Sequence, residues 1–166
     1  MANWCSVIID ITCKDIAGQQ AVYTDLKTTI DSESDAPELL GAWFITGNRY
    51  TVFMEGEVKW SLDEEDVKSF IRRITKVADI ASVDIDYEEI GYQLYGRYAY
   101  SDGVLKHLFV DPDKFPGDED ASLYSKLDDM LTNDPVEVII NIDADKESED
   151  DIKAWREARK ALKGVM

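Results

Sequence analysis

Apolar and polar residues alternate strictly near the start of the chain, over residues 5–13. One side of this segment carries Cys5, Val7, Ile9, Ile11 and Cys13, and the other carries Ser6, Asp10 and Thr12. A period of two predicts a strand with one buried face. From Asp15 to about residue 30 the spacing of apolar residues changes to that of a helix, with a stripe formed by Ile16, Tyr23, Leu26 and Ile30.

Two further strands are predicted near residues 40–46 and 50–59, with a turn at Gly47-Asn48 because these residue types tolerate the positive φ of tight hairpins. A second helix follows. Ser61 and Glu64 have the spacing of a capping box, and acidic residues fill the first turn. Its apolar stripe consists of Val67, Phe70, Ile71, Ile74, Val77 and Ala78.

A strand near 80–88, with Ala81, Val83, Ile85 and Tyr87 on one side, completes the order strand, helix, two strands, helix, strand. This order predicts an α+β protein whose residues 1–90 form a ferredoxin-like βαββαβ core, an antiparallel sheet with two helices on one face.

Residues 91–166 continue as a ββαβα segment. Asp-Gly at 102–103 predicts a hairpin between strands at 92–100 and 104–110. A loop over 111–120 leads to a helical stripe from Ala121 to Leu131, an alternating strand over 136–142 and a last helix near 148–163. With no linker or repeat in view, we expect this segment to extend the first sheet within a single domain, 1–166.

Length and composition favour one soluble domain with a sizeable core, since 45% of the 166 residues are hydrophobic. No apolar run is long enough to cross a bilayer, and no basic segment precedes the first apolar stretch as in a signal peptide. We therefore expect a cytoplasmic protein. Cys5 and Cys13 lie about 26 Å apart if the strand is extended, too far for a disulfide, so both are predicted to be buried apolar groups.

Negative charge is the unusual property of this sequence, with 35 acidic and 18 basic residues and a net charge of −17. It is concentrated in residues 111–151, where 15 acidic and 3 basic residues give −12, whereas residues 152–166 carry a net +4. Such a surface repels nucleic acid and anionic membranes, and it attracts basic proteins.

Residues that could carry catalysis are few. His107 is the only histidine, lies in a predicted strand and favours a structural role. The run from Asp111 to Asp120 resembles a calcium loop, but Phe115 and Pro116 stand where a ligand and a glycine belong, which favours an acidic cap for the following helix. Glu88 and Glu89 point to opposite faces, and the acids of 143–151 fit a solvated loop. We predict no enzyme activity, no cofactor and no metal site.

Tyrosines cluster between residues 87 and 100. If this segment is one strand, Tyr92, Tyr98 and Tyr100 share one face and Tyr95 takes the other. Aromatic residues on a ferredoxin-like sheet can stack RNA bases, but only Arg97 and Lys106 supply positive charge nearby. Core packing, or exposure at a protein interface, is the preferred interpretation.

Three short segments carry a family likeness. They are residues 1–6 (MANWCS), Trp60-Ser61 before the second helix, and residues 87–92 (YEEIGY) followed by Tyr95-Gly96-Arg97-Tyr98 and Asp102-Gly103. Over roughly residues 1–110 the chain resembles the YubB-type ferredoxin-like domain family of plasmid and phage proteins. Two departures are Ser6-Val7, where the family has an Asn after the Cys, and Leu62-Asp63, where prolines are frequent. The resemblance implies a mobile-element accessory factor and no catalytic residues.

Charge and resemblance together predict a protein that binds a host nucleic-acid-binding effector through an acidic, phosphate-imitating surface, as an inhibitor of restriction or CRISPR-type defence would. Direct binding of nucleic acid or membrane is not expected. The predicted contact residues are Asp111, Asp113, Asp118, Glu119, Asp120, Asp128, Asp129, Asp143, Asp145, Glu147, Glu149 and Asp150. The alternatives are a homodimeric scaffold or regulatory module that is acidic only for solubility, and an enzyme with an acidic metal site.

Overall fold

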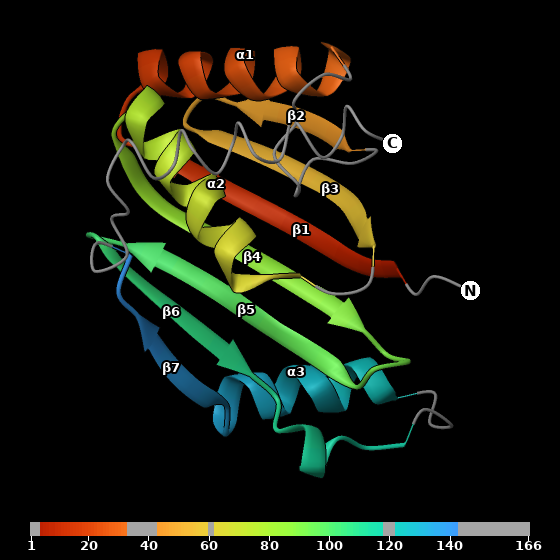
Figure 1. Ribbon diagram of the computed structural model, residues 1–166. Helices are drawn as coiled ribbons and strands as arrows, with labels where there is room; N and C mark the ends of the chain where they lie inside the picture. The colour runs from red at the N-terminus through yellow and green to blue at the C-terminus, as the bar shows by residue number, and fades with distance from the viewer. Residues whose placement is uncertain (1–3, 33–42, 60–61, 118–121, 143–166) are drawn as a thin grey trace, which may run out of the picture.

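The computed structural model describes residues 4–32, 43–59, 62–117 and 122–142. Along the chain the elements are β1 (Trp4–Cys13), α1 (Ile16–Ser32), β2 (Phe44–Asn48), β3 (Thr51–Lys59), α2 (Glu64–Val77), β4 (Ile80–Glu89), β5 (Leu94–Ser101), β6 (Val104–Phe109), the 3₁₀ turn η1 (Pro112–Lys114), α3 (Leu123–Asn133) and β7 (Val136–Ile140). The protein is therefore a mixed α+β structure, as predicted (Figure 1).

All seven of these strands form one antiparallel sheet in the order β2-β3-β1-β4-β5-β6-β7. β1 lies between β3 and β4, with Ile9 opposite Met54 on one side and Ile85 on the other. The strands after β4 each pair with the strand before them, so β5, β6 and β7 continue the same sheet. The sheet consequently brings together strands that are more than 70 residues apart in the chain.

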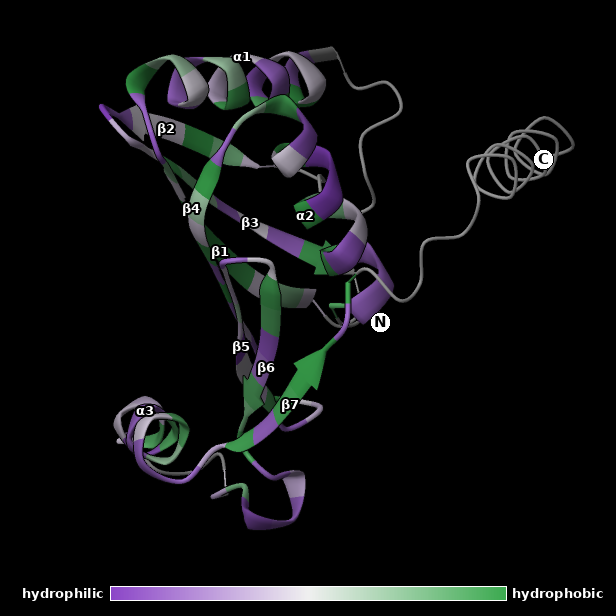
Figure 2. Cartoon of the chain, turned by 90° about the vertical axis from the view of Figure 1, so that its left-hand side faces the viewer, coloured by the Kyte–Doolittle hydropathy of each residue, from purple (hydrophilic) through white to green (hydrophobic). Residues whose placement is uncertain are grey.

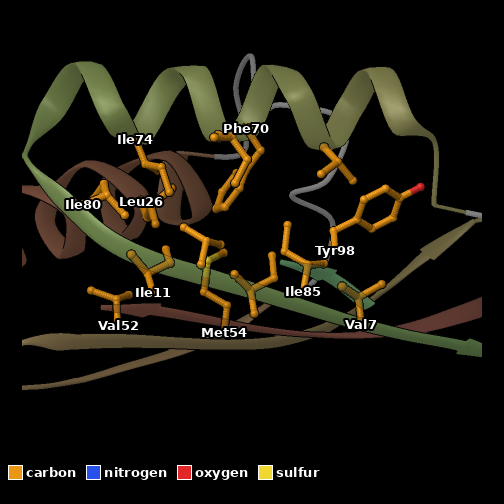
Figure 3. Close-up of a cluster of buried hydrophobic side chains, with 14 of the residues drawn as sticks. Val7, Ile11, Leu26, Val52, Met54, Phe70, Ile74, Ile80, Ile85 and Tyr98 are labelled. Atoms are coloured by element: carbon orange, nitrogen blue, oxygen red, sulfur yellow. The ribbon is translucent and has the colours of Figure 1, made fainter. Parts of the chain in front are cut away.

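The main core lies between the sheet and the two helices α1 and α2. Leu26 of α1 and Phe70 and Ile74 of α2 are fully buried against strand residues such as Ile11 and Met54 (Figure 3). The alternation predicted for β1 and β4 is confirmed, because Cys5, Val7, Ile9, Ile11 and Cys13 of β1 and Val83, Ile85 and Tyr87 of β4 are buried in this core. Cys5 and Cys13 are buried free thiols, as expected.

α2 begins as its acidic first turn predicts, but its cap is different. Asp63 is the N-cap and accepts a hydrogen bond from the backbone N–H of Glu65 at 3.0 Å. The capping box from Ser61 is therefore wrong: with the helix starting at Glu64, its N-cap position falls on Asp63. The predicted stripe is buried from Val67 to Ile74, whereas Val77 at the helix end is 37% exposed.

The hairpin of β2 and β3 turns at Arg49-Tyr50, not at Gly47-Asn48, which are the last two residues of β2. Gly47 serves packing instead, because a Cβ there would meet the Gln19 Nε2 of α1 at 2.6 Å. On α1, Gln19 and Val22 are buried, while Ile16, placed on the buried stripe by its spacing, is 40% exposed. Ile16 is the first residue of α1.

The hairpin of β5 and β6 forms as predicted, with Asp102 and Gly103 at positive φ of 51° and 79°. Tyr92 is not on the strand face with Tyr98 and Tyr100: it lies in the preceding turn and is 48% exposed. Tyr98 is 3% exposed and belongs to the main core, so it is not an interface residue.

α3 packs on the opposite side of the sheet from α1 and α2 (Figure 2). Its Leu123 and Leu127 form a second core with Val110, and Tyr95 packs against it. The acidic cap expected for this helix is absent from its described residues: Ser122 is the N-cap, and the first turn holds no acid. The last helix predicted near 148–163 lies outside the described residues.

Candidate protein interface

Half of the sheet has a polar face that the described helices leave uncovered. Because paired residues on neighbouring strands point to the same side, the register assigns this face to specific positions on β2, β3, β1 and β4. We call it the open face, and its positions are Phe44, Thr46, Asn48, Thr51, Phe53, Glu55, Glu57, Lys59, Trp4, Ser6, Ile8, Asp10, Thr12, Ser82, Asp84, Asp86 and Glu88.

Carboxylates converge on the open face from three strands. On β4, Asp84, Asp86 and Glu88 follow one another at every second residue, about 6.8 Å apart. Across the strands, Asp10 of β1 is directly opposite Asp84, and Glu55 and Asp86 both flank β1 at Ile8. Six acidic side chains that are far apart in the sequence therefore share one surface.

Few cations neutralise this surface among the described residues. Arg97 of β5 holds Asp86 through two hydrogen bonds, from Nε at 2.5 Å and from Nη2 at 3.2 Å. Further along the sheet, Lys106 Nζ lies 3.5 Å from Glu137 Oε1. Within the described ranges, no ion pair reaches Asp10, Glu55, Asp84 or Glu88, so this face keeps most of its negative charge.

Two of these acids show the electrostatic effect of the clustering. The pKa of Asp10 is raised, first because its carboxyl is partly desolvated and then because Asp86 and Asp84 are close. The pKa of Glu88 is raised by desolvation and by Asp128. A carboxylate binds its proton more tightly when other carboxylates are close, because protonation relieves their repulsion. A bound cation would relieve the same repulsion.

Exposed apolar side chains share the face with the carboxylates. Phe44 is 63% exposed, Trp4 53% and Ile8 37%. Exposed apolar residues that stand singly are ordinary on proteins, but apolar groups inside a charged surface are typical of protein interfaces.

α3 borders the open face and forms a hollow with β5–β7. Its volume is about 560 Å³, and its lining includes Leu108, Leu131 and Pro135, together with Arg97, Asp128, Thr132 and Glu137. The hydroxyl of Tyr95 donates a hydrogen bond to Asp128, which fixes that carboxylate beside the sheet. The acidic surface thus continues from β4 onto α3.

The predicted contact residues are only partly brought together. Asp128 joins the open face through Glu88, whereas Asp129 is exposed elsewhere on α3. Asp111 accepts a hydrogen bond from the N–H of Asp113 at 3.0 Å and caps η1. The others lie outside the described residues: Asp118, Glu119, Asp120, Asp143, Asp145, Glu147, Glu149 and Asp150.

Sequence reasoning missed the acids of the open face, although a signal for them was present. Asp10 alternates with buried residues of its strand, and Asp84, Asp86 and Glu88 do so on theirs. What the alternation does not say is that these two polar edges are neighbours. That follows only from the pairing of β1 with β4.

The other residues considered for catalysis make contacts within the fold. His107 Nε2 lies 2.6 Å from the Tyr87 hydroxyl, and its ring stacks on Tyr98 with centroids 4.0 Å apart. Burial lowers the pKa of His107 to about 4, so the imidazole is neutral at pH 7. Glu89 accepts a hydrogen bond from the N–H of Tyr92 at 3.2 Å, at the end of its strand. In the part of the chain that the structure describes, no group of three or more His, Cys, Asp or Glu is placed to hold a metal ion.

No family model, curated protein or solved structure matches this chain. Among the helices of the described ranges, none has both the length and the apolar character needed to span a bilayer.

Proposed function

We propose that this protein is a non-enzymatic accessory protein of a phage or plasmid, and that it binds a basic, nucleic-acid-binding protein of the host through its acidic surface. Inhibition of a restriction or CRISPR-type effector is the role that suits such a surface. The proposal includes a ferredoxin-like core, which is supported by the strand order β2-β3-β1-β4 and by α1 and α2 on one face.

The observation that carries the proposal is the convergence of carboxylates on the open face. Regularly spaced negative groups on a rigid sheet resemble the phosphates of a DNA strand, and a protein groove built for phosphates attracts both. The proposed contact surface therefore lies on β1, β3 and β4 and continues onto Asp128, instead of following the acidic run 111–151.

Capture from a host lysate tests the proposal. We expect the protein to retain a nucleic-acid-binding protein at low salt and to release it as salt rises, because charge drives the association. Recovery of proteins without any nucleic-acid-binding member would refute it.

Two double variants locate the surface at equal net charge. Asp10→Asn with Asp84→Asn removes two charges from the open face, while Asp113→Asn with Asp129→Asn removes two from η1 and α3. We expect the first pair to weaken partner binding at least about tenfold and the second to have a small effect. A larger loss from the second pair would return the contact surface to residues 111–151.

A homodimeric scaffold is the second candidate, and the edge strand β7 favours it. Val138 is 45% exposed and Ile139 67%, on a strand whose only partner among the described strands is β6. Open, apolar edge strands can pair with a second copy. Light scattering at low and high salt separates the two functions. Association of two acidic chains through β7 should become stronger as salt screens their repulsion, whereas association with a basic partner should become weaker.

A further inference from the structure

Resting on the proposed function, we infer that the open face receives one amphipathic, basic α-helix of the partner, lying along β1 beside α3. The occupant is a helix with an apolar stripe and with Lys or Arg on both sides of that stripe.

Two exposed apolar residues of the open face lie on an inner strand, while Phe44 lies on the edge strand β2. Ile8 and Trp4 are on β1, the central strand of this half of the sheet, and both are exposed. A surface that only imitated phosphates would need no apolar groups at its centre. Their exposure, 37% for Ile8 and 53% for Trp4, provides area that a partner can bury.

Acidic residues flank β1 on both sides at Ser6 and Ile8, whereas the position opposite Trp4 is Lys59. β3 contributes Glu55 and Glu57, and β4 contributes Asp84, Asp86 and Glu88. Because β3 and β4 are both neighbours of β1, the two acidic lines are two strand spacings apart, about 9.5 Å. That separation matches the 10–12 Å diameter of an α-helix with its side chains, so basic residues on both flanks of one helix can reach both lines.

Charge decides which helix fits. Asp10, Glu55, Asp84 and Glu88 have no ion pair within the described part of the chain, so the site attracts cations. A helix from a second copy is disfavoured, because each chain carries −17. Long basic side chains also suit the mixture, since their apolar stems cover Ile8 and Phe44 while their heads reach carboxylates.

α3 shows that this side of the sheet accepts a helix. It packs there through Leu123 and Leu127, beside Tyr95 of β5. Packed helices lie about 8–10 Å apart, which is two strand spacings, so the next helix along the sheet would lie over β1. The described residues place no helix there (Figure 2).

Two synthetic peptides of about 18 residues test this inference. Both contain the same Leu, Arg and Ala residues; one has Leu at helical spacing with Arg on both flanks, and the other has the order scrambled. By calorimetry we expect the patterned peptide to bind at least about tenfold more tightly. In amide NMR spectra its shifts should concentrate on β1, β3 and β4.

Substitutions separate the contribution of the exposed apolar side chains to peptide binding from that of the charges. Ile8→Ser should reduce binding of the patterned peptide about fivefold or more and leave the scrambled peptide unchanged, whereas Ile139→Ser, on the same side of the sheet at its far edge, should change neither. If Ile8→Ser lowers the melting temperature sharply, Trp4→Ser replaces it, because that side chain is 53% exposed.

Equal affinities for the two peptides, or NMR shifts confined to α3 or β7, would overturn the helix inference. If both peptides then still lose affinity with Asp10→Asn and Asp84→Asn, the acidic surface of the proposed function stands without it. If those charge variants also leave capture of the host partner unchanged, the proposed function fails as well.

Discussion

The like-charged pair of Asp10 and Asp84 should make the protein less stable than its neutralised variant. The two residues are directly opposite on β1 and β4, where Cβ atoms of paired residues are about 4.5–5.5 Å apart. Like charges in such positions destabilise a sheet by about 0.2–1 kcal/mol. Replacing Asp84 with Asn keeps the size of the side chain and removes this repulsion.

The magnitude follows from Coulomb's law at the surface. Two charges about 6 Å apart repel by about 0.7 kcal/mol in bulk water and by more where protein lowers the dielectric constant. Asp84→Asn also gives up a longer-range attraction to Arg97. We therefore expect a net gain of about 0.5 kcal/mol in the free energy of unfolding, which is about 0.25 M in the urea midpoint.

Salt and pH provide two independent checks of the cause. At 1 M salt the Debye length is about 3 Å, so the gain should nearly vanish. Because the folded-state pKa of Asp10 is raised, its carboxyl is protonated at low pH without penalty, and stability is lost as pH rises through that pKa. The gain from Asp84→Asn should thus be full at pH 7 and shrink toward pH 4.

Asp86→Asn is the matched control on the same strand and face. It removes the carboxylate held by Arg97 at 2.5 Å, a pair whose side chains are 40% and 44% exposed, so it should lower stability by up to about 1 kcal/mol. Opposite signs for the two variants support the reasoning. A loss of stability in Asp84→Asn, or a gain that persists at 1 M salt, would refute it.

Three further predictions concern the fold. Burial lowers the pKa of His107 from 6.5 to about 4, so as pH drops the unfolded chain takes up a proton before the folded chain does. Between pH 6.5 and pH 4 the free energy of unfolding, measured in urea, should therefore fall by about 2 kcal/mol more in wild type than in His107→Gln. Parallel pH profiles of the two proteins would contradict this prediction. Gly96→Ala should lower the stability by about 1–3 kcal/mol, because the new Cβ would lie 2.7 Å from the Leu108 carbonyl oxygen. Gly117→Ala is the control and should melt like wild type, because a Cβ at Gly117 would have no atom within 4 Å. Asp63→Ala should lower the stability by about 1 kcal/mol, because α2 loses its N-cap, whereas Asp63→Asn should retain most of the wild-type stability in thermal melts. Equal losses in the two variants would rule out a role of Asp63 as the cap.

Local patterns in the sequence were sufficient for most elements of the described chain. The alternation in β1 and β4 and the helical stripe of α2 are long and regular, so burial of one side decides the conformation. Asp102-Gly103 likewise specifies its turn, since both residues take positive φ. Shorter-range signals were less reliable. The turn predicted at Gly47-Asn48 lies at Arg49-Tyr50, and the cap predicted at Ser61 is Asp63.

The sequence by itself determined that Asp10 and the acids of β4 lie on polar strand faces, because each alternates with buried neighbours. Only the tertiary structure decided that these faces are adjacent. β1 pairs with β4 across more than 70 residues, and that pairing depends on how α1 and α2 pack against the sheet, not on any local preference. Charge counted along the chain predicted a surface in residues 111–151, most of whose acids lie outside the described residues. Electrostatic repulsion acts through space, so the acidic open face is a property of strand order and register.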